Sequence, residues 1–156
     1  LSDMNEDSQA GIAEENGKFV IRLKDGKNAG QVYADRMFTP PFVARWVVMT
    51  DSHNIRIYML GGRMILSHEN GQEWLEMYEP GRGELLRVDT VGRVSPNEYH
   101  EIEYEVLEDS FQVSINGVVR AQGKGNYKDL KGSISLGPGA GSVLTLEKFE
   151  VRAPVE

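Results

Sequence analysis

Three glutamates stand at every second position of the stretch HEIEYEV, which covers 100–106. Residues two apart in a β-strand share a face, so Glu101, Glu103 and Glu105 should point one way and the apolar residues between them the other. Two nearby carboxyl groups in different protonation states are the pair that general acid and base chemistry uses, and like charges in a row favour such a division. The alternative is a solvated strand face whose glutamates only keep the sheet soluble.

Charge and composition limit the chemistry that these glutamates can serve. The 156 residues include 17 Lys and Arg against 24 Asp and Glu, a formal charge of −7, and the basic residues are scattered. We therefore expect no nucleic-acid partner, because phosphate binding needs a basic patch. The absence of cysteine excludes disulfides, thiolate metal sites and cysteine nucleophiles, and it leaves the compartment open. No run approaches the ~20 apolar residues of a membrane helix, so we expect a soluble chain without a membrane partner.

The glutamate stretch is one of about a dozen short segments typical of β-strands. They are rich in β-branched and aromatic residues, and Gly, Asp, Asn or Pro separates them. The predicted strands cover 18–23, 31–37, 42–49, 54–60, 63–69, 73–78, 84–89, 100–107, 110–115, 118–122, 132–137 and 144–152. No segment has the pattern of an amphipathic helix.

Turn residues indicate how these strands connect. Asn116-Gly117, Gly61-Gly62 and Asn70-Gly71 each lie between two predicted strands and suit two-residue hairpins with positive φ. Hairpins join antiparallel strands, whereas a parallel sheet would need crossover helices. We therefore predict an all-β fold, an antiparallel β-sandwich or jelly roll that forms a single domain over 12–156. The polar stretch 1–11 is expected to be a flexible lead or linker.

The C-terminal part of the chain resembles concanavalin A-like (laminin G-like) sandwich domains. In these domains an aromatic-His pair opens a strand that leads into an Asn-Gly or Asp-Gly hairpin, and Gly-x-Ile-x-Leu and Phe-x-Val strands follow. The matching residues here are Tyr99-His100, Asn116-Gly117, 132–136 (GSISL) and 149–151 (FEV), although the first aromatic is more often Trp. The resemblance implies a concanavalin A-like jelly roll, a fold that hosts lectins, carbohydrate-binding modules, glycosidases and protein-interaction domains.

The segment EIEYE at 101–105 is similar to the E-I-D-x-E strand of laminarinase-type retaining glycoside hydrolases, which share this sandwich. That resemblance implies Glu101 as nucleophile and Glu105 as general acid/base, with Glu103 where the family has an aspartate. Retaining hydrolysis requires two carboxyl groups ~5–5.5 Å apart, and the shorter aspartate helps to set that arrangement. The departure at Glu103 and the short chain favour the solvated strand, so we expect no catalysis.

Aromatic and polar side chains on three other strands indicate a binding face. Alternation places Arg56 and Tyr58 outward on NIRIYML, Trp74 and Tyr78 outward on EWLEMY, and Arg45 opposite the apolar face of FVARWVVM. Rings flanked by planar polar groups suit sugars, whose C–H faces pack on the rings while their hydroxyls form hydrogen bonds. These five residues are the predicted ligand-binding set, provided that their strands are neighbours. The alternative is that Trp74 and Tyr78 belong to cross-strand pairs that only stabilise the sheet.

Metal ligands are not evident. The three histidines, His53, His68 and His100, fit no zinc spacing, and His100 alternates inward, which predicts a hydrogen-bonded core or rim histidine. Oxygen ligands that calcium could use occur at 24–28 and 51–54, but turn formation explains these Asp and Asn residues without a metal. No cofactor is predicted, and calcium stays open as an alternative.

Together these patterns predict a non-catalytic binding or sensory module, with carbohydrate or glycan as its ligand, appended to a larger protein. One alternative is a small retaining glycoside hydrolase that uses Glu101 and Glu105. Another is a protein-interaction or regulatory domain that buries the aromatic patch in a partner, such as another domain of its parent protein. The enzyme needs a cleft between two facing glutamates, the sugar binder an open groove at Trp74, and the interaction domain a flatter apolar patch.

Overall fold

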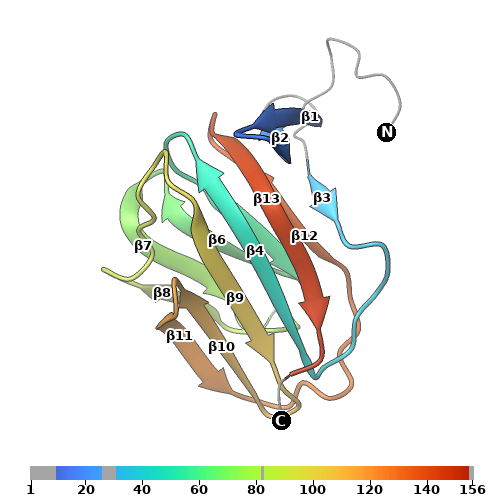
Figure 1. Cartoon of the computed structure of the whole chain (residues 1–156). Coiled ribbons are helices and arrows are strands. Elements are labelled where there is room, and N and C mark those ends of the chain that lie inside the picture. The colour runs from blue at the N-terminus through green and yellow to red at the C-terminus, as the bar shows by residue number, and fades with distance from the viewer. Residues whose placement is uncertain (1–9, 26–30, 82, 155–156) are drawn as a thin grey trace.

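A computed structural model describes residues 10–25, 31–81 and 83–154. These residues form 13 strands and no helix, arranged as two antiparallel sheets that pack face to face (Figure 1). The predicted all-β sandwich is therefore confirmed. None of the described segments is a helix long and apolar enough to cross a membrane.

The two sheets differ in size. The seven-stranded sheet has the order β1-β2-β13-β4-β9-β10-β11, and the six-stranded sheet has the order β3-β12-β5-β6-β7-β8. The strands of the first are β1 (Ala10–Glu15), β2 (Lys18–Lys24), β4 (Phe42–Thr50), β9 (His100–Val106), β10 (Ser110–Ile115), β11 (Val118–Lys124) and β13 (Val143–Arg152). Those of the second are β3 (Val32–Tyr33), β5 (Ile55–Met59), β6 (Gly62–His68), β7 (Gly71–Tyr78), β8 (Leu85–Val88) and β12 (Ile134–Pro138).

Alternating side chains build one apolar layer between the sheets. In β9, Ile102 and Tyr104 are buried in this layer, whereas the alternating glutamates Glu101, Glu103 and Glu105 are half-exposed on the outside. In β4, the fully buried Trp46 stacks on Phe149 of β13, with ring centroids 5.4 Å apart. A shift of one residue in the strand pairing would expose these apolar side chains to solvent, so their burial fixes the register.

The motifs behind the family resemblance contact each other. His100 is buried, its Nδ1 lies 3.0 Å from the side-chain amide of Asn116, and its Nε2 lies 2.9 Å from the carbonyl oxygen of Ser95. These contacts suit a ring that accepts at Nδ1 and donates from Nε2. Asn116 and Gly117 have φ values of 50° and 80° and make the predicted two-residue turn between β10 and β11. The buried, hydrogen-bonded histidine and the hairpin are both confirmed.

Two predicted turns are shifted by one residue. Leu60 and Gly61, with φ values of 49° and 80°, connect β5 to β6 in place of Gly61-Gly62. Glu69-Asn70 connects β6 to β7 in place of Asn70-Gly71, and the pairing of these strands is irregular around Ser67, which has a φ of 48°. Local sequence identifies the turn region, but the pairing of the flanking strands decides which residues occupy it.

Two strand predictions change at the N-terminal end of the chain. β1 was not expected, but the turn Asn16-Gly17, with φ values of 51° and 78°, pairs it with β2. Ala10 and Gly11 thus belong to a strand, and the rest of the expected lead, 1–9, lies outside the described residues. The strand predicted at 31–37 is reduced to β3, because the chain pairs with β12 over only two residues there.

Candidate functional site

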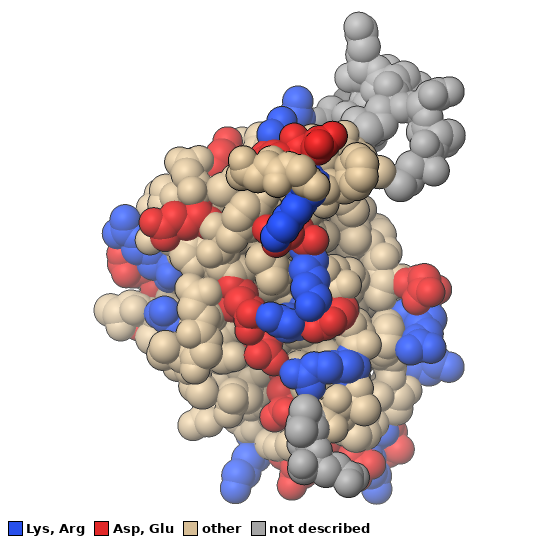
Figure 2. Space-filling view, in the orientation of Figure 1, with Lys and Arg blue, Asp and Glu red and all other residues tan. Residues whose placement is uncertain are grey.

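The first two glutamates of EIEYE belong to a row of ion pairs on the outer face of the seven-stranded sheet. Arg45 of β4 forms an ion pair with Glu101, and its Nη1 lies 3.2 Å from Oε1 of Glu150 on β13. Glu103 forms a similar pair with Arg152, at 3.4 Å. Figure 2 shows the result as blue and red atoms that alternate along the middle of this face. Glu101 therefore has a cationic partner on the adjacent strand β4, and Glu103 has one on β13, across β4.

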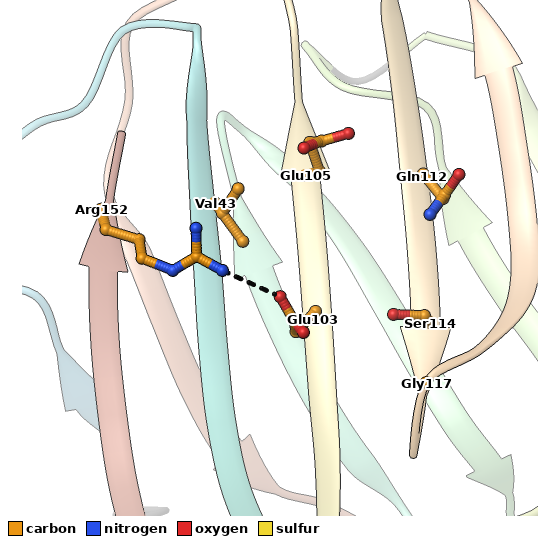
Figure 3. A pocket seen from close by; sticks show the side chains of 7 residues that line it. All are labelled: Val43, Glu103, Glu105, Gln112, Ser114, Gly117 and Arg152. Atoms are coloured by element: carbon orange, nitrogen blue, oxygen red, sulfur yellow. Dashed lines mark hydrogen bonds and ion pairs between the residues drawn. The ribbon is translucent and has the colours of Figure 1, made fainter. Parts of the chain in front are cut away.

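The third glutamate lies at one end of the same row. Glu101 and Glu105 are four residues apart on one strand, which separates their Cα atoms by about 13 Å. Glu105 lines a shallow depression with Gln112 and Ser114 of β10, and Figure 3 shows these side chains side by side on the sheet surface. Glu101 is engaged by Arg45, whereas Glu105 lies beside polar side chains of β10. This arrangement suits the solvated strand face.

Four of the five predicted ligand-binding residues share the outer face of the six-stranded sheet. Arg56 and Tyr58 project from β5, Trp74 and Tyr78 project from β7, and β6 lies between these strands. Arg45 projects from β4 in the other sheet, where Glu101 and Glu150 engage it. Arg45 is therefore separated from the other four residues. The sequence could not predict this, because alternation identifies the side of a strand but not the sheet to which the strand belongs.

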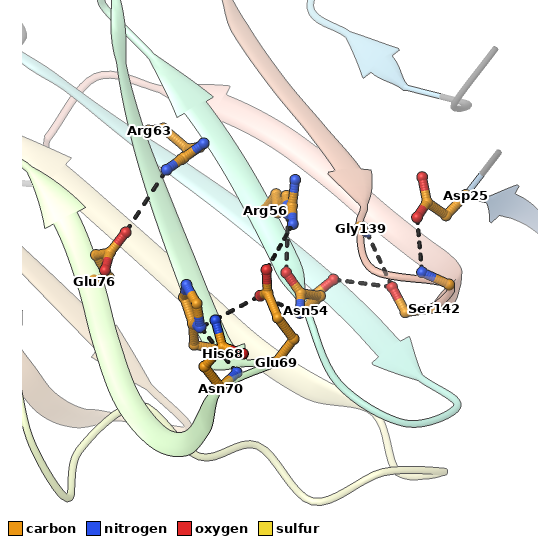
Figure 4. Close-up of polar contacts among 11 residues, drawn as sticks. Asp25, Asn54, Arg56, Arg63, His68, Glu69, Asn70, Glu76, Gly139 and Ser142 are labelled. Carbon is orange, nitrogen blue, oxygen red and sulfur yellow. Dashed lines mark hydrogen bonds and ion pairs between the residues drawn. The ribbon is translucent and has the colours of Figure 1, made fainter. Parts of the chain in front are cut away.

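A network of polar side chains lies where β5 begins, beside the turn between β6 and β7 (Figure 4). Asn54 is fully buried, and its side-chain amide donates to Oε2 of Glu69 at 2.8 Å and accepts from Nε of Arg56 at 2.9 Å. Nη2 of Arg56 lies 3.5 Å from Oε1 of Glu69. Nδ1 of His68 lies 3.3 Å from Oε2 of the same carboxylate. Asn54 and Glu69 are absent from the predicted ligand-binding set. The signals that could have indicated them are an Asn at the start of a strand and a Glu in a hairpin turn.

The environment of Glu69 favours its ionised form. Burial raises the pKa of this carboxyl group, but the hydrogen bonds from Asn54 and from its own backbone amide, with the charges of His68 and Arg56, lower it further. The net result is a pKa below the ordinary value. Glu69 therefore stays an acceptor of hydrogen bonds throughout the neutral range.

The glycine-rich segment GPGAGS, at 137–142, contacts this network through Ser142 and Gly139. The hydroxyl of Ser142 donates to the backbone carbonyl of Asn54 at 3.2 Å and accepts from the backbone amide of Gly139 at 3.1 Å. The guanidinium of Arg56 packs on Gly139, where a Cβ atom would lie 2.0 Å from Nε. A side chain at 139 would therefore displace the Arg56 guanidinium from this position.

An aromatic ring adjoins the network on its other side. The ring of Trp74 lies 5.8 Å from that of His68, measured between centroids, and the guanidinium of Arg87 lies 4.2 Å from the Trp74 centroid. Glu76, on the same face, forms ion pairs with Arg63 at 3.6 Å and Arg87 at 3.0 Å. Trp74 therefore packs in a cross-strand stack, which is the alternative to ligand binding that the sequence analysis left open. It also lies next to the hydrogen-bonded groups of the network.

The two tyrosines lie farther along the same face. Tyr58 is opposite Arg63 in the pairing of β5 with β6, and both residues line a shallow depression with Tyr78. Gly61 and Gly62 complete its wall. The face thus runs from a polar network through Trp74 to an open depression with two phenol rings.

The stretches considered for calcium have structural contacts. A carboxylate oxygen of Asp51 accepts from the backbone amide of Val143 at 2.8 Å and from the hydroxyl of Ser52 at 3.0 Å. Asp25 accepts from the backbone amide of Gly141 at 2.7 Å, and 26–28 lies outside the described residues. Across the described ranges, no group of three or more His, Asp or Glu side chains is placed to hold a metal ion.

Several proteins of known structure are similar to this chain. The carbohydrate-binding module CBM66 from Bacillus subtilis aligns with a TM-score of 0.63 at 8% identity, over 92% of each chain. A glycoside hydrolase family 16 endo-glucanase from Bacteroides ovatus aligns with a TM-score of 0.70 at 10% identity, over 94% of this chain and 86% of the other. The galectin LEC-6 from Caenorhabditis elegans aligns with a TM-score of 0.57 at 10% identity, over 84% and 95%.

Sequence comparison adds nothing to this, since no family model and no curated protein matches. At such low identities the structural similarity establishes the fold alone. The chain has the concanavalin A-like jelly-roll sandwich of lectins and glucanases, as its C-terminal motifs predict.

Proposed function

We propose that this chain is a non-catalytic carbohydrate-binding domain whose sugar site is the outer face of the six-stranded sheet. The observation that carries the proposal is the network of Asn54, Arg56 and Glu69 beside the ring of Trp74. A guanidinium and a carboxylate held side by side offer donors and acceptors to neighbouring sugar hydroxyls, and an aromatic ring offers a surface for sugar C–H groups. The combination is what a sugar, with its polar rim and apolar face, requires.

The rigidity of the network supports the same function. The side chains of Arg56 and Glu69 are 21% and 30% exposed, so they are reachable from solvent but largely confined by their neighbours. Side chains that are already ordered lose little entropy when a ligand binds. Sugars bind through many weak contacts, and such preorganisation favours them. Because Arg87 stacks on Trp74 in the free protein, we expect a bound sugar to displace that guanidinium.

The structural neighbours favour a glycan over other ligand classes. A carbohydrate-binding module and several glucanases share this sandwich. This argument rests on analogy at the level of the fold, so the site geometry has to carry the assignment.

Hydrolysis by Glu101 and Glu105 is the second candidate. The E-x-E-x-E pattern and the similarity to family 16 glycoside hydrolases favour it. The ion pair that engages Glu101 with Arg45, and the glutamate at 103 in place of the family's aspartate, argue against it. We therefore rank it below sugar binding.

A glycan and polysaccharide binding screen tests the proposal, with reducing-end release assayed in the same wells. Wild type is run beside Trp74→Ala and Glu101→Gln. Phe19→Ala is a matched control, because Phe19 is an exposed aromatic residue of β2, in the other sheet. Loss of binding in Trp74→Ala alone, without sugar release, is the expected result. Release that Glu101→Gln abolishes would replace the proposal with a hydrolase, and no binding by wild type to any probe would favour a protein partner.

A further inference from the structure

The second half of β13 has a neighbouring strand on one side only. β2 pairs with 143–146 of β13, whereas β4 pairs with it as far as 152. Within the described part of the chain, no strand pairs with 148–152 on the side away from β4. Figure 1 shows β13, in red, continuing past the short hairpin of β1 and β2. Every second residue along such an edge turns its N–H and C=O groups outward, unpaired.

A groove runs beside this open edge. One wall is β13 itself, and the other is the segment that follows β3 along the edge of the six-stranded sheet. Two hydrogen bonds fix this second wall. The amide of Ala34 donates to the carbonyl of Ile134 in β12, and that of Phe38 donates to the carbonyl of Gly132, just before β12, both at 2.9 Å. The groove is therefore a built feature between two fixed segments, at the open side of the sandwich.

The groove is lined by apolar residues and by charged residues of both signs, among them Asp35, Arg36 and Glu150. Phe149 and Val151 pair with inward-facing residues of β4, so they turn toward the groove, whose other wall includes Ala34 and Phe38. The residues of β13 between these positions carry charges and lie on the outer face of the sheet.

The charges on β13 restrict what can bind. Lys148 and Arg152 have side chains 47% and 41% exposed. Lys148 lies 3.6 Å from Glu150, which Arg45 also engages, and Arg152 lies 3.4 Å from Glu103. Residues placed beside Lys148 and Arg152 are therefore favoured if they are acidic. A second copy of β13, paired antiparallel about Glu150, would set Lys148 against Arg152 and Glu150 against itself. Like charges directly opposite each other are destabilising, which disfavours a dimer through this edge in that register.

We propose that this edge binds an extended peptide segment of a partner protein, which adds a strand to the seven-stranded sheet in line with β2. Its alternate apolar residues would enter the groove against Phe149 and Val151, and acidic residues would lie beside Lys148 and Arg152. Only a polypeptide backbone supplies donors and acceptors at the spacing of a sheet edge, and side-chain pockets add specificity. The site shares no residue with the proposed sugar face, so the two activities stand or fall separately.

The test is an NMR titration with a synthetic peptide that alternates valine with polar residues and has glutamate at its two outer polar positions. We expect amide shifts at 148–152 and 33–38, and protection from exchange at every second residue of 148–152. Lys148→Glu should weaken binding by up to about fivefold, and a peptide with lysine in place of the matching glutamate should restore it. Lys128→Glu, an exposed change of equal charge, is the control.

Three results would overturn the proposal. The first is the absence of shifts at 148–152 at any peptide concentration. The second is equal affinity for a peptide with N-methylated backbone amides, since such a peptide cannot pair with a sheet edge. The third is protection of 148–152 in the free protein that grows with protein concentration, which would show that a second copy occupies the edge.

Discussion

Asn54 determines the geometry of the proposed sugar site although it is itself inaccessible. It is fully buried with a φ of 55°, a left-handed conformation that asparagine adopts more readily than most residues. Its side chain uses its donor for Glu69 and its acceptor for Arg56. A single buried amide thus fixes both charged groups that face the ligand.

Replacement of Arg56 by lysine should lower sugar affinity about tenfold, because lysine lacks the planar fork and loses one to two hydrogen bonds of ~1 kcal/mol each. Lysine keeps the positive charge, so a loss of affinity would show that the planar shape of the guanidinium matters. The matched control is Arg45→Lys, in the seven-stranded sheet. Isothermal titration with a glycan retained in the screen provides the measurement, and equal losses in both variants would contradict this role for Arg56.

The lowered pKa of Glu69 predicts how sugar binding depends on pH. Because the pKa of Glu69 lies below the ordinary value of 4.5, its carboxylate stays ionised down to that pH and accepts hydrogen bonds from the sugar. This contribution to affinity is lost as pH falls further and the group is protonated. Affinity should therefore be constant from neutral pH to about 4.5 and fall below it. Glu69→Gln should bind more weakly at neutral pH and lack this acid limb, as measured by titrations across that range. An unchanged acid limb in Glu69→Gln would assign the titration to another group.

Elements whose conformation is set locally were the ones that the sequence could predict. Asn116-Gly117 requires positive φ at both positions, and few residue pairs supply it, so the β10–β11 hairpin followed from two residues. The turn at Leu60-Gly61 depends on which residues of β5 and β6 pair, and that choice is made by burial across the sandwich. Its position was therefore missed by one residue.

Gly117→Ala should destabilise the fold by about 1 kcal/mol, the typical cost of placing a Cβ in the left-handed region. Gly117 has a φ of 80°, and no atom lies within 4 Å of the position of the new Cβ, so the cost would be backbone strain alone. Gly62→Ala is the control, because its φ is ordinary and its new Cβ would lie 3.4 Å from Cβ of Tyr78. Urea unfolding of both variants measures the difference, and equal stability would refute the strain argument.

At the scale of the whole molecule, the two outer faces of the sandwich have different chemistry. The seven-stranded sheet presents ion pairs centred on Arg45, and the six-stranded sheet presents Trp74, two tyrosines and the Asn54 network. Alternation predicted which residues point outward, including the glutamates and Trp74. It could not predict that Arg45 and Trp74 lie on opposite sides, since strand order depends on pairing between segments far apart in sequence.

The two tryptophans should differ strongly in their contribution to stability. Trp46 is fully buried and stacked on Phe149, so Trp46→Ala should cost about 3–5 kcal/mol of unfolding free energy. Trp74 is half-buried at the surface, so Trp74→Ala should cost about 1 kcal/mol and leave the fold intact. Chemical denaturation of both variants provides the comparison, and similar losses would contradict the assignment of Trp74 to a binding face.

The most direct test of the proposed sugar site is a map of backbone amide shifts as wild type is titrated with the glycan that binds best in the screen. The predicted result is a set of shifts confined to β5, β6, β7 and the turn at Glu69-Asn70, which disappears in Trp74→Ala. Shifts centred on β4, β9 and β10, around Glu101 and Glu105, would contradict the account and move the sugar site to the seven-stranded sheet.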